Sequence, residues 1–155
     1  AAAVPRGAAP GAPAGPASGP GERARPGLAG RVPLLGARSD VADVLAACDV
    51  GVLGSRSEGF PLALLEYGSA GLAVVATEVG ECPAILDGGR AGRLVPPGDP
   101  GALAGALVEV LADDAARREL GAGLRRRVEE RYGAAAVIGR VEGIYDDVAG
   151  VGPSR

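Results

Sequence analysis

The sequence contains no histidine, no lysine and no tryptophan, and aromatic residues make up only 3% of it. Without histidine, the chain itself supplies no histidine acid–base group, no Ser-His-Asp triad and no histidine metal ligand. The scarcity of aromatic residues predicts an aliphatic core. The two cysteines form no CxxC pair, which favours a reducing, cytoplasmic setting. We expect Cys48 in the core, whereas Cys82 follows a glycine turn and is a candidate for exposure.

The overall charge and hydropathy indicate a globular domain without a nucleic-acid partner. The formal net charge is −3, so the chain lacks the basic field on which nucleic-acid binding depends. With 47% hydrophobic and 23% charged residues, the 155 residues suffice for one domain with a real core. The sequence has no apolar run of about eighteen residues or more, which predicts no membrane-spanning segment.

Composition divides the chain into three parts. Residues 1–27 are rich in alanine, glycine and proline and lack apolar periodicity, which predicts a disordered lead-in. Residues 28–149 are expected to form the folded domain, and residues 150–155 a flexible tail.

Short apolar runs alternate with helical patterns along the domain. Strands are predicted at residues 32–35, 50–53, 73–76 and 93–95, and helices at residues 40–47, 61–70, 100–112, 114–131 and 134–148. Ser39 or Asp40 can cap the first helix, and Asp99 with Pro100 can begin the third. The alternation predicts the α/β class, as a Rossmann-like parallel sheet flanked by helices with a helical tail.

Two glutamates stand around the expected start of the helix at residues 61–70. Glu58 precedes the start, Glu66 lies inside the helix, and Pro61 suits the first helical position. Free amides at a helix start attract phosphate, and each carboxylate can accept hydrogen bonds from a vicinal diol. The segment therefore suits a phosphorylated, polyhydroxylated ligand. In the alternative interpretation, Glu58 only complements the helix dipole and Glu66 lies on a solvated face.

A second loop is expected beside Glu58. Ligands of parallel sheets bind at the carboxyl ends of the strands, and residues 77–81 follow such an end. We expect them to line the cleft, with Gly80 supplying a tight turn; a plain left-handed turn is the alternative. Within the preceding helix, Gly68 should cost about 1 kcal/mol relative to alanine.

The helix expected at residues 114–131 is rich in arginine and glutamate. The spacing favours ion pairs between residues i and i+4 on solvated helix faces. A second interpretation is a basic patch that touches anionic lipid. The buried faces are expected to come from Leu124, Val128, Val137, Ile138, Val141 and Ile144.

Several segments follow one another in an order typical of one enzyme family. They are residues 31–36, 49–53, 57–61 with Glu66, 74–80, 91–99 and the arginine-rich helix that ends at residues 130–132. On these segments, residues 28–147 resemble the carboxy-terminal, nucleotide-sugar-binding half of a family 4 type glycosyltransferase of GT-B architecture. The resemblance implies transfer of a sugar from a nucleotide-diphosphate sugar to an acceptor hydroxyl, with retention of configuration and without a bound metal or other cofactor.

The resemblance also implies residue roles and partners. Glu58 would contact the donor sugar as the catalytic residue, and Glu66 would bind the ribose. The remaining donor-binding positions are Gly59, Phe60, Pro61 and Leu62 at the sugar and phosphates, and Arg38 at the base. The implied partners are the nucleotide sugar, an acceptor glycan, lipid or small molecule, an amino-terminal GT-B domain, and the inner face of the membrane as a peripheral contact.

Three departures from the family pattern concern activity. Ala84 stands where the family usually has glutamate, Ala73 stands where it commonly has proline, and the lysine expected at the donor diphosphate is missing. The lead-in also replaces the segment that should carry this lysine. We therefore expect a fragment truncated at its amino end and inactive in isolation. The alternatives are a catalytically silent nucleotide-sugar-binding module and an inactive fragment.

Overall fold

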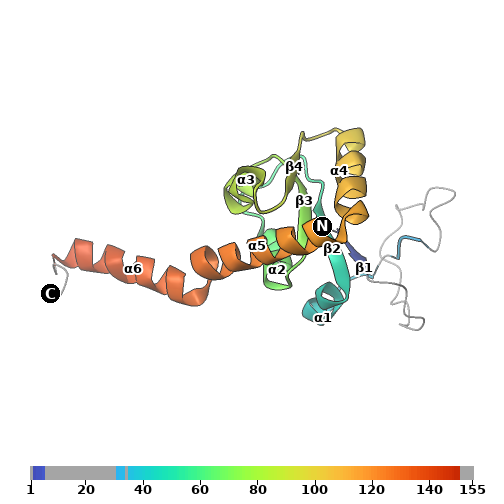
Figure 1. The fold of residues 1–155 in the computed structure, drawn as a ribbon. Coiled ribbons are helices and arrows are strands. Elements are labelled where there is room, and N and C mark those ends of the chain that lie inside the picture. Colours follow the sequence, from blue (N-terminus) through green and yellow to red (C-terminus); the bar gives the residue numbers. More distant parts are fainter. Residues whose placement is uncertain (1, 6–30, 34, 151–155) are drawn as a thin grey trace.

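A four-stranded sheet lies at the centre of the structure, a computed structural model that describes residues 2–5, 31–33 and 35–150 (Figure 1). The strands, in their order across the sheet, are β1 (Ala2–Pro5), β2 (Cys48–Leu53), β3 (Ala73–Thr77) and β4 (Arg93–Val95). Strands β2, β3 and β4 are parallel, and β1 runs antiparallel to β2. The parallel part confirms the predicted Rossmann-like sheet.

Helices flank this sheet and form the tail. They are α1 (Val41–Ala46), α2 (Leu62–Ser69), α3 (Cys82–Ile85), the 3-10 helix η1 (Asp87–Gly89), α4 (Pro100–Ala112), α5 (Asp114–Tyr132) and α6 (Ala134–Ala149). The five predicted helices are confirmed to within one residue at each end. The sequence did not predict α3 and η1, because a single turn is too short to show a helical apolar period.

Apolar side chains cover both faces of the sheet. All five residues of β3 are buried, and the first four alternate between two clusters. Val74 and Ala76 pack in a cluster with residues of α2, α3 and α5, whereas Val75 packs with Val110 of α4 in a second cluster. A parallel strand that is buried on both faces reads as a continuous apolar run, as residues 73–76 do.

Close packing between α2 and α5 explains the glycine inside α2. A Cβ atom at Gly68 would lie 2.5 Å from Cγ2 of Val128 and 3.1 Å from Cγ of Leu124. These distances are too short for a real contact, so α5 approaches α2 this closely only because residue 68 has no side chain. The packing offsets the lower helix propensity of Gly68.

The amino-terminal edge of the sheet differs from the prediction. Residues 31–33 and 35 form no strand, so the strand predicted at residues 32–35 is wrong there, and Leu34 lies outside the described residues. The edge of β2 is taken instead by β1, with Val4 opposite Val50 and a register shift before Pro5. The expectation of a disordered lead-in is therefore wrong at residues 2–5, and residues 6–27 lie outside the described residues. Backbone pairing needs no particular side chains, and an edge strand tolerates proline.

Helix capping agrees with the sequence at one helix start and differs at another. Oδ1 of Asp99 accepts a hydrogen bond from the amide of Ala102 at 2.9 Å, as expected for the cap of α4. Asp40 occupies the N-cap position of α1, but its side chain makes no cap hydrogen bond. Its carboxylate instead accepts hydrogen bonds from the guanidinium of Arg38.

The tail splits into a packed helix and an exposed one. Leu124 and Val128 of α5 are buried, as predicted. The prediction of a buried face on α6 is wrong, because its four predicted core residues are 39% to 63% exposed: Val137, Ile138, Val141 and Ile144. Figure 1 shows the reason, since α6 projects away from the sheet and follows only the end of α5.

The arginines of α5 have several kinds of partner. Arg125 pairs with Glu129 at 2.9 Å, which confirms one of the predicted i to i+4 pairs. Arg117 instead pairs with Asp114 at 2.6 Å and reaches Asp49 at 3.7 Å. Contact of this helix with anionic lipid stays a prediction.

Both cysteines are buried. Cys48 is 5% exposed, as expected, but Cys82 is fully buried in the cluster between the sheet and α5, so its expected exposure is wrong. Burial raises the pKa of both thiols, which lowers their reactivity. Among the residues that the structure describes, no helix has both the length and the apolar content that a bilayer crossing requires.

Candidate functional site

The candidate site is built on the loop that leaves the carboxyl end of β2. Glu58 lies half-buried in this loop. The hydroxyl of Ser55, three residues earlier, donates a hydrogen bond to Oε1 of Glu58 at 2.6 Å. One oxygen of this carboxylate is thus held by the loop itself. The other oxygen can still accept hydrogen bonds, because both oxygens of a carboxylate are acceptors.

A buried threonine ties the same loop to the neighbouring strand. Thr77, the last residue of β3, is only 4% exposed. Its hydroxyl lies 2.6 Å from the carbonyl oxygen of Ser55 and 3.3 Å from that of Leu53. A hydroxyl carries a single proton, and the shorter distance identifies the Ser55 carbonyl as its main acceptor. The carboxyl ends of β2 and β3 are therefore joined at Ser55, the residue that holds the Glu58 carboxylate.

The loop after β3 lies against the other side of the Glu58 backbone. Gly80 has a φ of +50°, and a Cβ atom there would lie 2.1 Å from the carbonyl oxygen of Glu58. The amide of Glu81 donates to the carbonyl oxygen of Gly59 at 3.1 Å. The structure thus confirms that residues 77–81 lie beside the Glu58 loop. The residue at 80 must be glycine for two reasons, the left-handed backbone and the close approach.

The start of α2 is open. The N-cap residue is Pro61, with φ −77° and ψ 95°, so its predicted place as the first helical residue is wrong by one position. Proline has no side-chain acceptor, and no side chain caps α2. The amide of Leu64 donates to the Pro61 carbonyl oxygen at 3.0 Å. The amides of Leu62 and Ala63 keep their capacity to donate to a ligand, at the end where the helix dipole is positive. A Cβ atom at Gly59 would meet nothing within 4 Å, so packing inside the chain does not require glycine there.

The side chain of Phe60 turns toward α5. Its ring contacts the ring of Tyr132 edge-on, with the ring centroids 5.8 Å apart and the planes at 60°. Tyr132 is the last residue of α5. This contact fixes the loop to the end of α5, while the backbone of Phe60 remains between Gly59 and the start of α2. The side chain of Leu62, the first residue of α2, is 65% exposed.

The two remaining predicted residues lie at other positions. Glu66 lies in α2 and is exposed. Arg38 lies in the segment before α1, where its guanidinium donates to Asp40. The hydrogen bond from Arg38 holds the pKa of the Asp40 carboxyl below its usual value. Arg38 thus has an internal partner, and its place at a nucleotide base stays a prediction.

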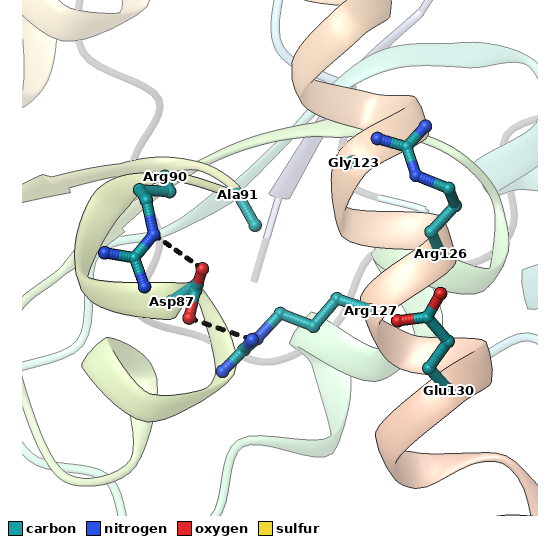
Figure 2. Close-up of a pocket in the computed structure, with 7 residues that line it drawn as sticks. All are labelled: Asp87, Arg90, Ala91, Gly123, Arg126, Arg127 and Glu130. Carbon is teal, nitrogen blue, oxygen red and sulfur yellow. Dashed lines mark hydrogen bonds and ion pairs between the residues drawn. The ribbon is translucent and has the colours of Figure 1, made fainter.

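A shallow pocket of about 280 Å³ lies at a different place, between η1 and α5 (Figure 2). Its lining residues are Asp87, Arg90, Ala91, Gly123, Arg126, Arg127 and Glu130. The Asp87 carboxylate lies between two guanidiniums, 2.7 Å from Nε of Arg90 and 2.9 Å from Nη1 of Arg127. Arg127 also donates to the carbonyl oxygens of Ala84 and Ile85. Asp87 is thus paired with both Arg90 and Arg127, and we interpret this part of the pocket as a structural junction between α3, η1 and α5.

We also searched the described part of the chain for a cation site. In residues 2–5, 31–33 and 35–150, no group of three or more histidine, cysteine, aspartate or glutamate residues could hold a metal ion.

Sequence reasoning did not identify Ser55 and Thr77 as supports of Glu58. A serine three residues before a carboxylate is a usual spacing for a local side-chain hydrogen bond, and this signal was present in the sequence. Thr77 could not be found in this way, because its bonds to Leu53 and Ser55 span 22 to 24 residues and depend on the pairing of β2 with β3.

Comparison with known proteins shows the family to which the chain belongs. Residues 12–113 match the family described as Glycosyl transferases group 1. The chain belongs to this family. The matched region contains the whole sheet from β2 to β4 and both loops of the candidate site.

Individual family relatives are similar over most of this chain. N-acetyl-alpha-D-glucosaminyl L-malate synthase of Bacillus anthracis is 34% identical over 118 residues, which cover 76% of this chain and 31% of the relative. The solved structure of sucrose-phosphate synthase from Thermosynechococcus elongatus is 33% identical, with a TM-score of 0.64 over 69% of this chain and 27% of that one. The fold is thus that of GT-B glycosyltransferases.

A third relative is a single domain. It is the carboxy-terminal domain of a glycosyl transferase group 1 family protein from Francisella tularensis, which is 26% identical, with a TM-score of 0.59 over 66% of this chain and 53% of that one. The chain described here spans about a third of the length of the Bacillus anthracis relative.

Proposed function

We propose that this group 1 chain is the donor-binding half of a retaining glycosyltransferase, which transfers a sugar from a nucleotide-diphosphate sugar to an acceptor hydroxyl. The observation that carries the proposal is the pairing of Glu58 with the open start of α2. A half-buried carboxylate, held at one oxygen, stands four residues before the first residue of a helix whose start no side chain caps. A sugar diphosphate needs both kinds of group, an acceptor for hydroxyls and donors for phosphate.

In this proposal the predicted residues of the Glu58 loop and of α2 keep their roles. Glu58 accepts hydrogen bonds from the donor sugar through the oxygen that Ser55 leaves open. The backbone of Gly59, Phe60, Pro61 and Leu62 faces the sugar and phosphates, and the missing side chain at Gly59 admits a ligand against the main chain. Glu66, exposed on α2, binds the ribose diol.

The protein contributes position and charge stabilisation to the reaction. The donor phosphate helps to remove the proton from the acceptor hydroxyl, so the chain needs no histidine base, and it has none. Preorganised amides and a fixed carboxylate stabilise the charge that develops at the reacting centre. No metal and no other cofactor takes part in the proposed reaction.

An amino-terminal domain is expected to supply the acceptor site. This expectation agrees with the share of the relatives that the chain spans and with the similarity to an isolated carboxy-terminal domain. We place the protein in the cytoplasm, where its acceptor is a glycan, a lipid or a small molecule. Transfer should be detectable, as release of the nucleoside diphosphate, only when the acceptor-binding domain is supplied.

Calorimetric titration of the chain with UDP, GDP and ADP tests the donor site. We expect saturable binding of one of them, and a roughly ten- to hundredfold weaker affinity in Glu66→Ala, because hydrogen bonds to a charged group are lost. Glu142→Ala, which removes an exposed glutamate of α6, is the matched control and should bind like the wild type. Failure of the wild-type chain to bind any of the three nucleotides would contradict the proposal.

A further inference from the structure

We propose that Ser55 and Thr77 are positioning residues, which hold the Glu58 carboxylate in the one orientation that accepts the donor sugar. The inference rests on the proposed function, because it assigns the sugar contact to Glu58. It adds one residue of the Glu58 loop and one residue at the end of β3, neither of which was predicted to act on Glu58. Neither side chain needs to touch the ligand.

The hydrogen bond from Ser55 fixes the carboxylate itself. A free glutamate side chain rotates about three bonds, and holding it still on ligand binding costs conformational entropy. The 2.6 Å bond to Oε1 removes much of this freedom before the ligand arrives. It leaves Oε2 free to accept from a sugar hydroxyl, because the serine proton can be given to only one acceptor at a time.

The hydrogen bond from Thr77 fixes the backbone from which Ser55 acts. The Ser55 carbonyl accepts the Thr77 hydroxyl at 2.6 Å, and the threonine is 4% exposed. Buried hydrogen bonds of this length are costly to break, because the freed carbonyl would find little water. Thr77 stands at the end of β3, whose five residues are all buried, so the support reaches down to the core of the sheet.

The chain after β3 also holds the loop, at the backbone of Glu58 and Gly59. Gly80 lies against the Glu58 and Gly59 carbonyls, and the Glu81 amide donates to Gly59. The loop after β3 therefore restrains the backbone of Glu58, whereas Ser55 restrains its carboxylate. The two restraints are separate, so removing the Ser55 hydroxyl should free the carboxylate without displacing the backbone.

This separation predicts a selective effect on binding. The phosphates and ribose are assigned to the α2 amides and Glu66, which Ser55 does not contact. Removing the Ser55 hydroxyl should therefore leave nucleoside diphosphate affinity unchanged. Affinity for the nucleotide sugar should fall by about tenfold, the size of one lost hydrogen bond.

The test compares nucleotide with nucleotide sugar in the same chain. Wild type, Ser55→Ala and Ser55→Thr are titrated with UDP and UDP-glucose, GDP and GDP-mannose, and ADP and ADP-glucose. We expect Ser55→Ala to lose the extra affinity that the sugar provides, and Ser55→Thr, which keeps a hydroxyl, to regain it. Ser69→Ala is the control, since it removes a serine hydroxyl that donates to the Leu65 carbonyl at 2.9 Å on the far end of α2.

A second pair of variants tests the buried support. Thr77→Val keeps the shape of the side chain but removes the hydroxyl, and it should reduce the sugar-dependent affinity as Ser55→Ala does. Thr77→Ser keeps the hydroxyl and should retain that affinity. Equal weakening of nucleotide and nucleotide sugar in Ser55→Ala would overturn the inference, because it would indicate general damage to the loop.

A measurement without ligand separates this inference from the proposed function. Side-chain scalar couplings measured by NMR report the rotamers of Glu58. We expect one dominant rotamer in the wild type and averaged couplings in Ser55→Ala. Identical couplings in the two proteins would overturn the positioning role even if nucleotide sugars bind. If the couplings differ but the wild type binds no nucleotide, the proposed function fails, while the restraint on Glu58 stands.

Discussion

Two polar clusters of this chain are each centred on a carboxylate, and they differ in how many oxygens of that carboxylate the chain itself uses. The Glu58 cluster consists of Glu58, Ser55 and Thr77, and its carboxylate uses one oxygen internally. The Asp87 cluster consists of Asp87, Arg90 and Arg127, and both oxygens of its carboxylate accept from guanidiniums. The first cluster leaves an acceptor for a ligand, whereas the second is closed upon itself.

The difference shows how a binding site can be distinguished from a structural junction. The hollow in Figure 2 lies at the Asp87 cluster, so shape alone would place a ligand there. The count of satisfied hydrogen-bonding groups points to the Glu58 loop, where a carboxylate oxygen and the amides at the start of α2 remain available. The comparison makes three predictions, which run from a large effect to a small one.

Gly80→Ala should break the Glu58 cluster most severely. A methyl group at residue 80 would meet the Glu58 carbonyl oxygen at 2.1 Å, and the backbone there has a positive φ. We expect a loss of about 3 kcal/mol in the free energy of unfolding, measured by urea denaturation, together with weaker nucleotide-sugar binding. Gly98→Ala is the control, since residue 98 also has positive φ but would meet nothing within 4 Å. Equal losses in both variants would show that the close approach does not matter.

Arg127→Ala should break the Asp87 cluster without affecting the Glu58 loop. The change removes hydrogen bonds to the Ala84 and Ile85 carbonyls and the ion pair with Asp87. We expect the free energy of unfolding to fall by about 2 kcal/mol while nucleotide affinity stays unchanged. The exposed pair of Arg125 and Glu129 is the reference, and Arg125→Ala should cost about 0.5 kcal/mol or less. A loss of nucleotide affinity in Arg127→Ala would count against the assignment of this cluster as structural.

Asp87→Asn should change stability in a pH-dependent way. The hydrogen bond from Arg90, with the charge of Arg127, holds the pKa of Asp87 below its ordinary value. A lowered folded-state pKa stabilises the protein above the unfolded pKa of about 3.9, and this contribution is lost as the pH falls through the folded value. The variant should therefore be less stable than wild type at pH 6. The difference between the two free energies of unfolding should become smaller toward pH 3.

Urea denaturation at pH 6 and pH 3 measures this difference in the free energy of unfolding. Asp146→Asn, on the exposed helix α6, is the control. Asparagine suits the comparison because Asp87 has a φ of +57°, a conformation that asparagine also tolerates. A difference that does not change with pH would show that the ionised Asp87 carboxylate does not contribute through its charge.

The sequence was sufficient for the parts of the fold that depend on local periodicity. A continuous apolar run predicted β3, and apolar spacing with a cap predicted α4. It failed at both ends of the domain for one physical reason. Strand β1 is held by backbone pairing to β2, and the apolar side chains of α6 have little to pack against. In both cases the outcome depends on which partner is present, and a local pattern does not contain that information.

The candidate site divides in the same way. Glu58, Glu66 and the start of α2 could be predicted, because they follow one another along the chain. The support from Thr77 and the contact of Gly80 with Glu58 required the three-dimensional pairing of β2 with β3. The assigned roles of Glu58 and Glu66 stay predictions until ligand binding is measured.

The contact between Phe60 and Tyr132 gives the site an optical reporter. The chain has three tyrosines and no tryptophan, so tyrosine emission is not masked by indole. Tyr132 rests on the ring of Phe60, one residue from Gly59, whereas Tyr67 is buried in the core and Tyr145 is exposed on α6. A ligand that binds to the loop changes the surroundings of Tyr132, one of the three fluorophores. Tyrosine fluorescence of the unlabelled protein can therefore report ligand binding at this loop.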